Sequence, residues 1–358
     1  MVTKITLQRL YNQHIEGPKL QTPAEVVAWL GAVQSQDYTG GKWATGLRTT
    51  GITDDAIERA FNDGAILRTH VMRPTWHFVT PEDIRWLLEL TAPRIHALNA
   101  HYTRQLELDD TLLARSKDTI IKALEGGKHL TRAEVGVALA AVGIDVTNMA
   151  RLGMIVSHAE LEGIVCSGAR RGKEHTYGLV DERAPKARRL TRDEALAELT
   201  LRYFTSHGPA TVKDFVWWSG LTVADAKAGI EMVKSQLTQE DVDDQTYWYG
   251  VSARAATDIS RTVYLLPNFD EYLVGYTDRN ALFDAAHSEH LDSRGNVLFN
   301  HTIVMDGRVV GTWKRTFKKE AAVITSTPFI AFSDAENQAF VEAAHRYGEF
   351  LDMEVVLS

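Results

Sequence analysis

The sequence predicts an α+β fold in which a unit of helices followed by a β-hairpin recurs along the chain, ahead of a β-rich C-terminal region. Three observations support this prediction. Capping motifs begin pairs of short helices, the apolar periodicity then changes from helical to alternating, and turn residues separate the alternating runs. A helix-turn-helix pair followed by a hairpin is the winged-helix arrangement. We therefore expect tandem winged-helix (helix-turn-helix) units.

The clearest unit lies near the middle of the chain. A capping box at residues 131–134 begins a short helix, Gly143 ends it, and a second helix spans about 147–162. Two alternating runs follow, joined by the basic turn 168–173, and they predict a hairpin. A helix at 112–125 precedes these elements and completes a three-helix unit.

The same order recurs on both sides of this unit. Residues 22–25 begin a helix with proline in its first turn, residues 53–61 form another, and residues 66–79 form two extended runs. On the C-terminal side, the corresponding helices, capping patterns and strand lie at 195–206, 211–214, 222–225 and 246–251.

These repeats divide the chain into four segments. Winged-helix units are expected at 1–105, 106–190 and 191–255, and the β-rich C-terminal region at 256–358. A spacing of about 80 to 100 residues exceeds that of solenoid repeats, so tandem domains are predicted. The C-terminal region ends in a helix near 335–347, and its architecture is not defined by the pattern.

Composition sets the broad class of protein. The chain has 358 residues, 44% of them hydrophobic, enough for two or three globular domains at roughly 150 residues each. No stretch approaches the roughly 20 apolar residues that span a bilayer. Residues 1–20 lack the apolar core of a secretory signal. We expect a cytoplasmic protein with no membrane partner.

The net charge of 39 − 47 = −8 argues mildly against a nucleic-acid partner, because phosphate neutralisation drives such binding. The basic residues are nevertheless clustered. They gather at 170–173, 183–192 and 314–319. Local positive surfaces therefore remain compatible with a polyanionic ligand, although a charge run is more often a solvated face.

Several kinds of chemistry are excluded. The sequence has no phosphate loop, dinucleotide-binding fingerprint or nucleophile elbow. The single cysteine, Cys166, excludes an internal disulfide and a Cys-rich zinc site, and we expect it to be a small buried hydrophobic residue. His287 and His290 lack an apparent third ligand. We expect no metal and no cofactor, and we interpret Asp270-Glu271 as structural.

The segment at 30–48 stands out from this background. Gln34 and Gln36 follow the helix that begins at Thr22, with Gln34 expected at or near its end and Gly40-Gly41 expected to stop regular helix. At a helix end or in extended backbone the two carboxamides could converge on one target. Their spacing alone favours a structural role, in which both side chains hydrogen-bond the local backbone.

Three segments together resemble a known family. They are the Gln34-Ser35-Gln36 segment that ends at Arg48, ILRTHVMRPTWHFV at 66–79, and LLPNFDEYLVGYTDR at 265–279. They are similar to the winged-helix DNA-binding family of AlkZ/YcaQ-like alkylpurine DNA glycosylases. The resemblance extends over nearly the whole chain and implies tandem winged helices around a basic channel.

The resemblance also implies an activity. In the family, a Gln-x-Gln or Gln-x-Asp motif is catalytic, and Gln34 and Gln36 occupy its positions in the AlkZ-type Gln-x-Gln form. The implied enzyme is a monofunctional DNA glycosylase, a DNA-repair hydrolase that cleaves the N-glycosidic bond of N7-alkylated guanine in double-stranded DNA. Bulky adducts and crosslinks are within its implied range. Asp37 is expected to have a turn or helix-end role.

The resemblance also suggests where DNA binds. The candidate DNA contacts are Arg48, Arg68, Arg73, His77, Arg170, Arg171 and Lys173. Alternative roles stay open, because Arg68 and Arg73 could pair with acidic neighbours and His77 could be buried. Covalently tandem units favour a monomer that encloses DNA.

Two other functions remain open from the sequence. The first is a non-catalytic winged-helix regulator or damage sensor that binds DNA. The second is a protein-interaction scaffold, which the net charge of −8 favours. Salt-dependent binding to duplex DNA separates the scaffold from the other two.

Overall fold

The structure is a computed structural model that describes residues 2–251, 262–291, 296–319 and 321–358. It forms two compact units. Unit 1 comprises Met1–Glu58, Ala197–Trp218 and Thr222–Ser358, and unit 2 comprises Arg59–Leu196 and Ser219–Leu221. Among the described residues, no helix is long and apolar enough to cross a membrane. The finer division into four segments stays a prediction, and its boundary at 255/256 lies outside the described residues.

Unit 2 contains the elements predicted for residues 106–190. Its helices are α5 (Ile84–Gln105), α6 (Asp110–Leu124), α7 (Arg132–Ala141), α8 (Met149–Leu161) and α9 (Val180–Arg183). Its sheet has the order β4-β6-β5, formed by β4 (Leu130–Thr131), β6 (Thr176–Leu179) and β5 (Val165–Ser167). The predicted capping box is confirmed, because the Thr131 hydroxyl accepts from the Glu134 backbone N–H and the Glu134 carboxylate from that of Thr131.

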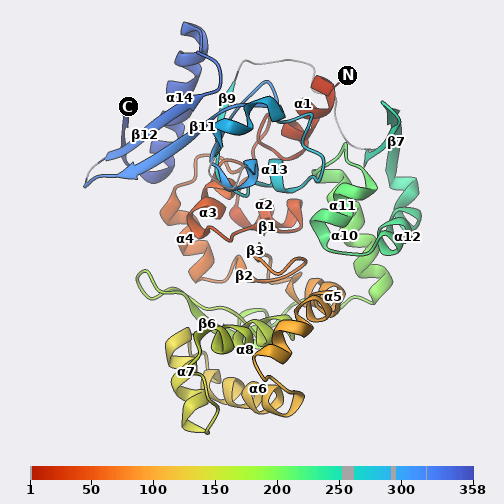
Figure 1. Cartoon of the computed structure of the whole chain (residues 1–358), viewed down its shortest axis with the longest axis vertical. Helices are drawn as coiled ribbons and strands as arrows, with labels where there is room; N and C mark the ends of the chain where they lie inside the picture. The colour runs from red at the N-terminus through yellow and green to blue at the C-terminus, as the bar shows by residue number, and fades with distance from the viewer. Residues whose placement is uncertain (1, 252–261, 292–295, 320) are drawn as a thin grey trace. The chain divides into compact units, whose positions relative to one another are not determined.

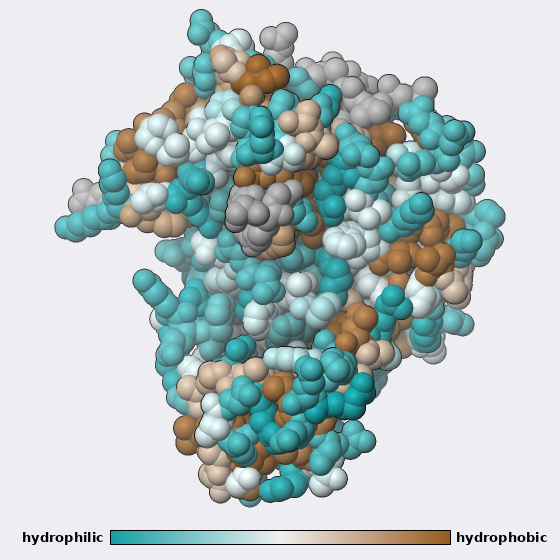
Figure 2. Space-filling view, viewed as in Figure 1, coloured by the Kyte–Doolittle hydropathy of each residue, from teal (hydrophilic) through white to brown (hydrophobic). Residues whose placement is uncertain are grey.

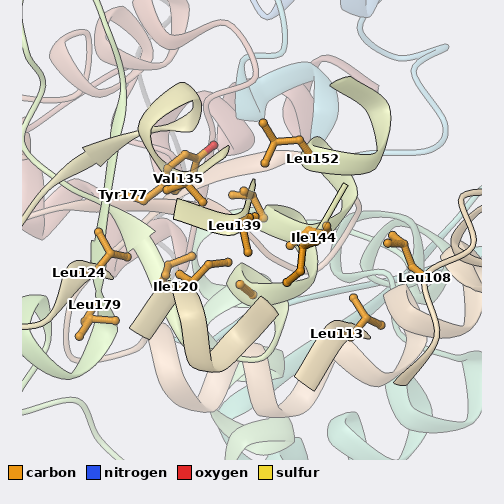
Figure 3. Packing of buried hydrophobic residues seen from close by; sticks show 14 residues of the cluster. Leu108, Leu113, Ile120, Leu124, Val135, Leu139, Ile144, Leu152, Tyr177 and Leu179 are labelled. Carbon is orange, nitrogen blue, oxygen red and sulfur yellow. The ribbon is translucent and has the colours of Figure 1, made fainter. Parts of the chain in front are cut away.

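The core of unit 2 lies between α6, α7, α8 and this sheet (Figure 3). Ile120 and Leu124, one turn apart on α6, both point into it, together with Leu139 of α7 and Leu152 of α8. Each such side chain stabilises the unit by about 1.5–3 kcal/mol when fully buried. Cys166 is also buried, as predicted, and burial raises the pKa of its thiol to about 12.

A second hairpin of unit 2 follows α4 (Asp54–Asn62), a helix that begins in unit 1. It consists of β2 (Leu67–His70) and β3 (Trp76–Val79), which pair antiparallel with Leu67 opposite Val79. The two extended runs predicted at 66–79 are therefore confirmed.

The N-terminal part of unit 1 contains α1 (Val2–Asn12), α2 (Pro23–Leu30), the two-residue strand β1 (Val33–Gln34) and α3 (Tyr38–Gly46). The helix start predicted at 22–25, with proline in the first turn, is confirmed, and a capping box between Thr22 and Glu25 is present there. Gly31 then takes a φ of 82°, a conformation that suits glycine, and ends the helix. Gln34 therefore lies in extended backbone, which is one of the two conformations expected for it, and not at the end of α2.

The expectation that Gly40-Gly41 stops regular helix is wrong, because both residues lie inside α3. The glycines allow close packing here. A Cβ atom on Gly40 would lie 3.0 Å from Asn268 Oδ1, and one on Gly46 would lie 2.5 Å from the Phe350 ring. Tertiary contacts therefore override the weak helix propensity of glycine in this segment.

The third predicted set of elements is also present. It consists of α10 (Arg192–Ser206), which begins in unit 2, α11 (Val212–Ser219), α12 (Val223–Val233), the 3₁₀ turn η1 (Lys234–Gln236), and the hairpin of β7 (Leu237–Val242) and β8 (Gln245–Gly250). A capping box between Thr222 and Asp225 begins α12, as predicted. Thr211 and Asp214 bond reciprocally at the start of α11.

The C-terminal region of unit 1 is β-rich, as predicted. A five-stranded sheet has the order β13-β12-β11-β10-β9, formed by β13 (Glu354–Leu357), β12 (Ala321–Pro328), β11 (Arg308–Phe317), β10 (Thr302–Met305) and β9 (Val263–Leu266). Only the β12-β13 pair is parallel. The helix α14 (Asp334–Leu351) packs against this sheet (Figure 1). The short helix α13 (Glu271–Val274) and the 3₁₀ helices η2 (Ala285–His290) and η3 (Val297–Phe299) lie between β9 and β10 in the sequence.

Candidate functional site

The two glutamines of the Gln-x-Gln segment lie in unit 1, in the short non-helical stretch between α2 and α3. Gln34 is buried, with 5% of its surface exposed, whereas Gln36 is exposed. Asp37 begins α3 as its N-cap, and its carboxylate accepts a hydrogen bond from Gly40 N at 3.1 Å. The helix-end role expected for Asp37 is thus present, and α3 fixes one end of the glutamine segment.

A buried carboxylate fixes the segment near its other end. Glu271 Oε1 accepts a hydrogen bond from the backbone N–H of Gln34 at 2.7 Å. Glu271 Oε2 accepts one from the Trp218 indole at 2.8 Å, and His207 Nε2 lies 3.4 Å away. All of these side chains except that of Gln34 are fully buried. A short hydrogen bond between buried groups holds backbone position firmly, so Glu271 positions Gln34.

The surroundings of Glu271 are aromatic and tightly bonded. Burial lowers the pKa of His207, whose ring stacks on Tyr203 at 4.9 Å between centroids. Gln13 Nε2 donates to the Tyr276 hydroxyl at 3.0 Å, and that hydroxyl donates to the His207 carbonyl at 2.7 Å. The anchor of Gln34 is therefore part of a connected network of buried groups, and such networks resist local displacement.

Arg48 lies inside the protein with its donors engaged there, which contradicts the DNA contact expected for it. Its surface is only 1% exposed, and its guanidinium pairs with the carboxylate of Asp270 at 2.8 and 2.9 Å. The carbonyl and side-chain oxygens of Gln13 and the carbonyl of Ala44 accept its remaining N–H groups. All five donors of the side chain are therefore used within the protein.

Asp270 and Glu271, interpreted from the sequence as structural, act on two different segments. Asp270 caps α13 by accepting from Tyr272 N at 2.9 Å and neutralises Arg48. Glu271 binds the backbone of Gln34. Sequence reasoning missed this link to the glutamines. The sequence does contain one signal for it. The acidic pair lies among the apolar residues of LLPNFDEYLVGYTDR, so both carboxylates are expected to be buried, and buried carboxylates require partners.

A separate cavity of about 540 Å³ lies in unit 1, and its lining includes Lys19, Tyr264 and Arg346. Burial lowers the pKa of Lys19 to about 7. Large cavities and shifted pKa values often mark active sites. Neither glutamine is among the residues that line this cavity, so we do not assign it to the Gln-x-Gln chemistry.

Three of the expected DNA contacts lie on the β2-β3 hairpin of unit 2. His77 is fully buried, with Nδ1 3.0 Å from the Thr75 carbonyl, so a direct DNA contact is not retained for it. Arg68 is 8% exposed, and its guanidinium lies 4.5 Å from the centre of the Trp76 ring, which gives it a packing role. Arg73, in the turn between the strands, is half-buried.

The other three expected contacts lie on the turn between β5 and β6, at 168–175. This turn projects from the helices of unit 2, and its visible surface is hydrophilic (Figures 1 and 2). Arg171 and Lys173 are exposed. Arg171 donates to Glu134 at 2.7 Å and to the His129 carbonyl at 2.9 Å. Arg170 is half-buried and braces the turn by donating to the Lys173 carbonyl at 2.8 Å.

Comparison with known proteins agrees with the three sequence segments. Residues 27–350 match the family model described as AlkZ-like, DNA glycosylase AlkZ-like. The chain belongs to the AlkZ-like DNA glycosylase family. Members of this family carry the name of an enzyme that hydrolyses the N-glycosidic bond of DNA, and the suspected resemblance is thereby confirmed.

Individual relatives cover nearly the same range. The chain is 26% identical over 322 residues to an interstrand DNA cross-link repair glycosylase of Streptomyces sahachiroi, a match that covers 86% of this chain and 85% of that protein. The solved structure of the Streptomyces sahachiroi DNA glycosylase AlkZ is similar with a TM-score of 0.80 and 22% identity, over 99% of both chains. The AlkZ-like fold therefore covers 99% of this chain.

Proposed function

We propose that this AlkZ-like glycosylase hydrolyses the N-glycosidic bond of N7-alkylated guanine in duplex DNA, with Gln34 and Gln36 as its catalytic residues. The observation that supports this most directly is the anchoring of the segment. Glu271 holds the backbone of Gln34 and Asp37 caps the following helix, so the backbone that carries the two carboxamides is fixed on both sides. Preorganised dipoles of this kind stabilise charge without reorganising during the reaction.

The charge of the substrate explains why two carboxamides, which are weak catalysts, are sufficient. Alkylation at N7 leaves guanine cationic, so the base departs without protonation by a general acid. A carboxamide cannot accept a proton at neutral pH, but it can orient a water molecule and support the oxocarbenium-like sugar. The water attacks the anomeric carbon as the carbon–nitrogen bond breaks, and one proton of that water is released to solvent. Gln36, the exposed glutamine, faces the medium from which this water comes.

The DNA-binding parts follow from the element order. We infer that α6, β4, α7, α8, β5 and β6 form a winged helix, whose wing is the β5-β6 turn. The order of elements from α2 to β3, and that from α10 to β8, repeat helices followed by a hairpin, which supports three tandem units. Such units in one chain favour a monomer on double-stranded DNA.

Release of the modified base from duplex DNA that contains N7-methylguanine tests the proposed reaction. Under single-turnover conditions the protein is expected to release free N7-methylguanine and leave an abasic site, with no strand cleavage before alkali. The matched control is the same duplex with unmodified guanine, which should stay intact. No release from the methylated duplex would retire the reaction for this lesion.

Larger N7 adducts form the second substrate class to test. The relative named as an interstrand cross-link repair glycosylase acts on crosslinked DNA by its name, and we extend that substrate to this chain as a proposal. A duplex crosslinked through N7 of two guanines should be unhooked by the same glutamines. A non-catalytic regulator would bind both duplexes and release nothing.

Removing exposed charge from the wing should weaken binding to DNA of any sequence. We expect Arg171→Ala and Lys173→Ala each to reduce the slope of log K against log salt by about 1, because one phosphate contact contributes about 0.9 to it. Titration of a fluorescent duplex at several salt concentrations measures this slope. Lys122→Ala, which removes an exposed charge from α6, is the matched control and should leave the slope unchanged. Equal slopes in all four proteins would remove the wing from the DNA interface and favour the scaffold hypothesis.

A further inference from the structure

A cluster of potential metal ligands lies in unit 2, away from the glutamines and the wing. His96 on α5, and His158 and Glu162 at the end of α8, place one ligand atom each within 4.8 Å of one another. His158 and Glu162 stand four residues apart, a spacing that brings two side chains to one face of a helix. The sequence pattern points only to His287 and His290, because nothing in it indicates that α5 packs on α8.

The contact between His96 and Glu162 is short but is not a hydrogen bond of good geometry. His96 Nε2 lies 2.9 Å from Glu162 Oε1. Within the part of the chain that the structure describes, this buried nitrogen nevertheless has no hydrogen-bond partner, so its N–H does not point at the carboxylate oxygen. Two atoms that share a zinc ion at about 2.1 Å lie roughly 3.4 Å apart and direct lone pairs, not N–H groups, toward a common point.

The third ligand and the available space complete the site. The rings of His96 and His158 lie 4.9 Å apart with their planes inclined by 50°, so they are not stacked flat against each other. A cavity of about 220 Å³ is lined by both His96 and Glu162, and it leaves room for a water molecule as a fourth ligand. Arg85 also lines this cavity, but it is paired with Asp181.

We propose that His96, His158 and Glu162 bind one Zn²⁺ ion that crosslinks α5 to α8. Two imidazoles and a carboxylate form a donor set that zinc accepts in a tetrahedral arrangement with water. The ion would tie the long helix α5 to the helix that leads into the wing. It would thereby stabilise unit 2 without taking part in the chemistry of the glutamines. This site is independent of the proposed base release, which needs no metal.

Titration of the metal-free full-length protein with Zn²⁺ against a chromophoric chelator tests the site. The wild type is expected to bind one Zn²⁺ per chain, and its melting temperature should rise when Zn²⁺ is added. His96→Ala, His158→Ala and Glu162→Gln should each weaken binding by at least about tenfold. The visible absorbance of Co²⁺, bound in place of zinc, should indicate tetrahedral coordination in the wild type and be lost in Glu162→Gln.

The double variant His287→Ala/His290→Ala is the matched control. These two histidines also stand close together, with ring centroids 6.0 Å apart, but they stack on Phe329. The double variant should bind Zn²⁺ as the wild type does. Glu162→Gln changes a partly exposed side chain, so it should fold even if a histidine variant does not. Absence of tight binding by the wild type, or equal binding by a folded Glu162→Gln, would overturn the proposal.

Discussion

Replacing either Gln34 or Gln36 with alanine is expected to slow single-turnover release of N7-methylguanine by about 10²–10³-fold, the cost of removing one preorganised donor from an active site. Binding to the undamaged duplex should stay nearly the same, because phosphate contacts supply most of that affinity. The rate of base release and the dissociation constant of the duplex are measured on the same preparations.

Gln21→Ala is the matched control for this pair. Gln21 is an exposed glutamine of the same unit that precedes α2, and its removal should leave the rate unchanged. Thermal unfolding must be compared as well, since Gln34 is 5% exposed and its loss leaves a small cavity. Full activity of folded Gln34→Ala and Gln36→Ala would show that the glutamines are not catalytic. It would favour the alternative in which they hydrogen-bond the local backbone.

The second large effect is on stability. Asp270→Asn is expected to lower the free energy of unfolding by about 3–5 kcal/mol, because it leaves the Arg48 guanidinium charged and buried without its counter-ion. The amide oxygen of asparagine can still cap α13, so the loss isolates the ion pair. Equilibrium urea unfolding followed by circular dichroism measures the change, fitted to as many transitions as the wild type shows.

Two further variants define the origin of that loss. Lys234→Met breaks the exposed pair of Lys234 with Glu231 in the same unit and should cost less than about 0.5 kcal/mol. Arg48→Met combined with Asp270→Asn should cost less than the sum of the single variants, by about 1–3 kcal/mol, since the two charges are coupled. If the losses of the two single variants simply add in the double variant, the interaction between Arg48 and Asp270 contributes nothing to the free energy of unfolding.

Much of the local structure was predictable from short-range chemistry. The capping boxes at Thr22, Thr131 and Thr222 begin helices because each hydroxyl satisfies a backbone N–H at a fixed spacing. The hairpins at 66–79 and after α8 follow from alternating apolar residues. These elements depend on neighbours within a few positions, so one sequence suffices to place them.

The errors at Gly40-Gly41 and at Arg48 share one cause, which is dependence on distant residues. Helix α3 contains Gly40, Gly41 and Gly46, and its stability comes from packing against parts of the chain that lie far away in sequence. Arg48 suggested a DNA contact because its partner Asp270 is 222 positions away. No local pattern reveals such a partner, and a buried arginine has the same sequence signature as an exposed one.

The candidate site was predictable in part. Family resemblance singled out Gln34 and Gln36, and the comparisons support the family to which that motif belongs. Their support by Glu271 and Trp218 became visible only in the structure. Spacing alone left a helix end and extended backbone both open for Gln34, and the structure decides for the extended backbone because Gly31, with a φ of 82°, ends α2.

The two adjacent carboxylates of Asp270-Glu271 have a consequence for how this enzyme can be divided. Asp270 binds Arg48, which follows the end of α3. Glu271 joins the backbone of Gln34 to Trp218 of α11. The glutamine segment and the end of α3 lie far from α11 in the sequence, and all of them contact the dipeptide Asp270-Glu271. A fragment that carries the glutamines alone lacks the buried groups that fix the backbone of their segment. Any split, fusion or domain exchange of this protein therefore has to carry Asp270 and Glu271 together with the glutamine segment that Glu271 supports.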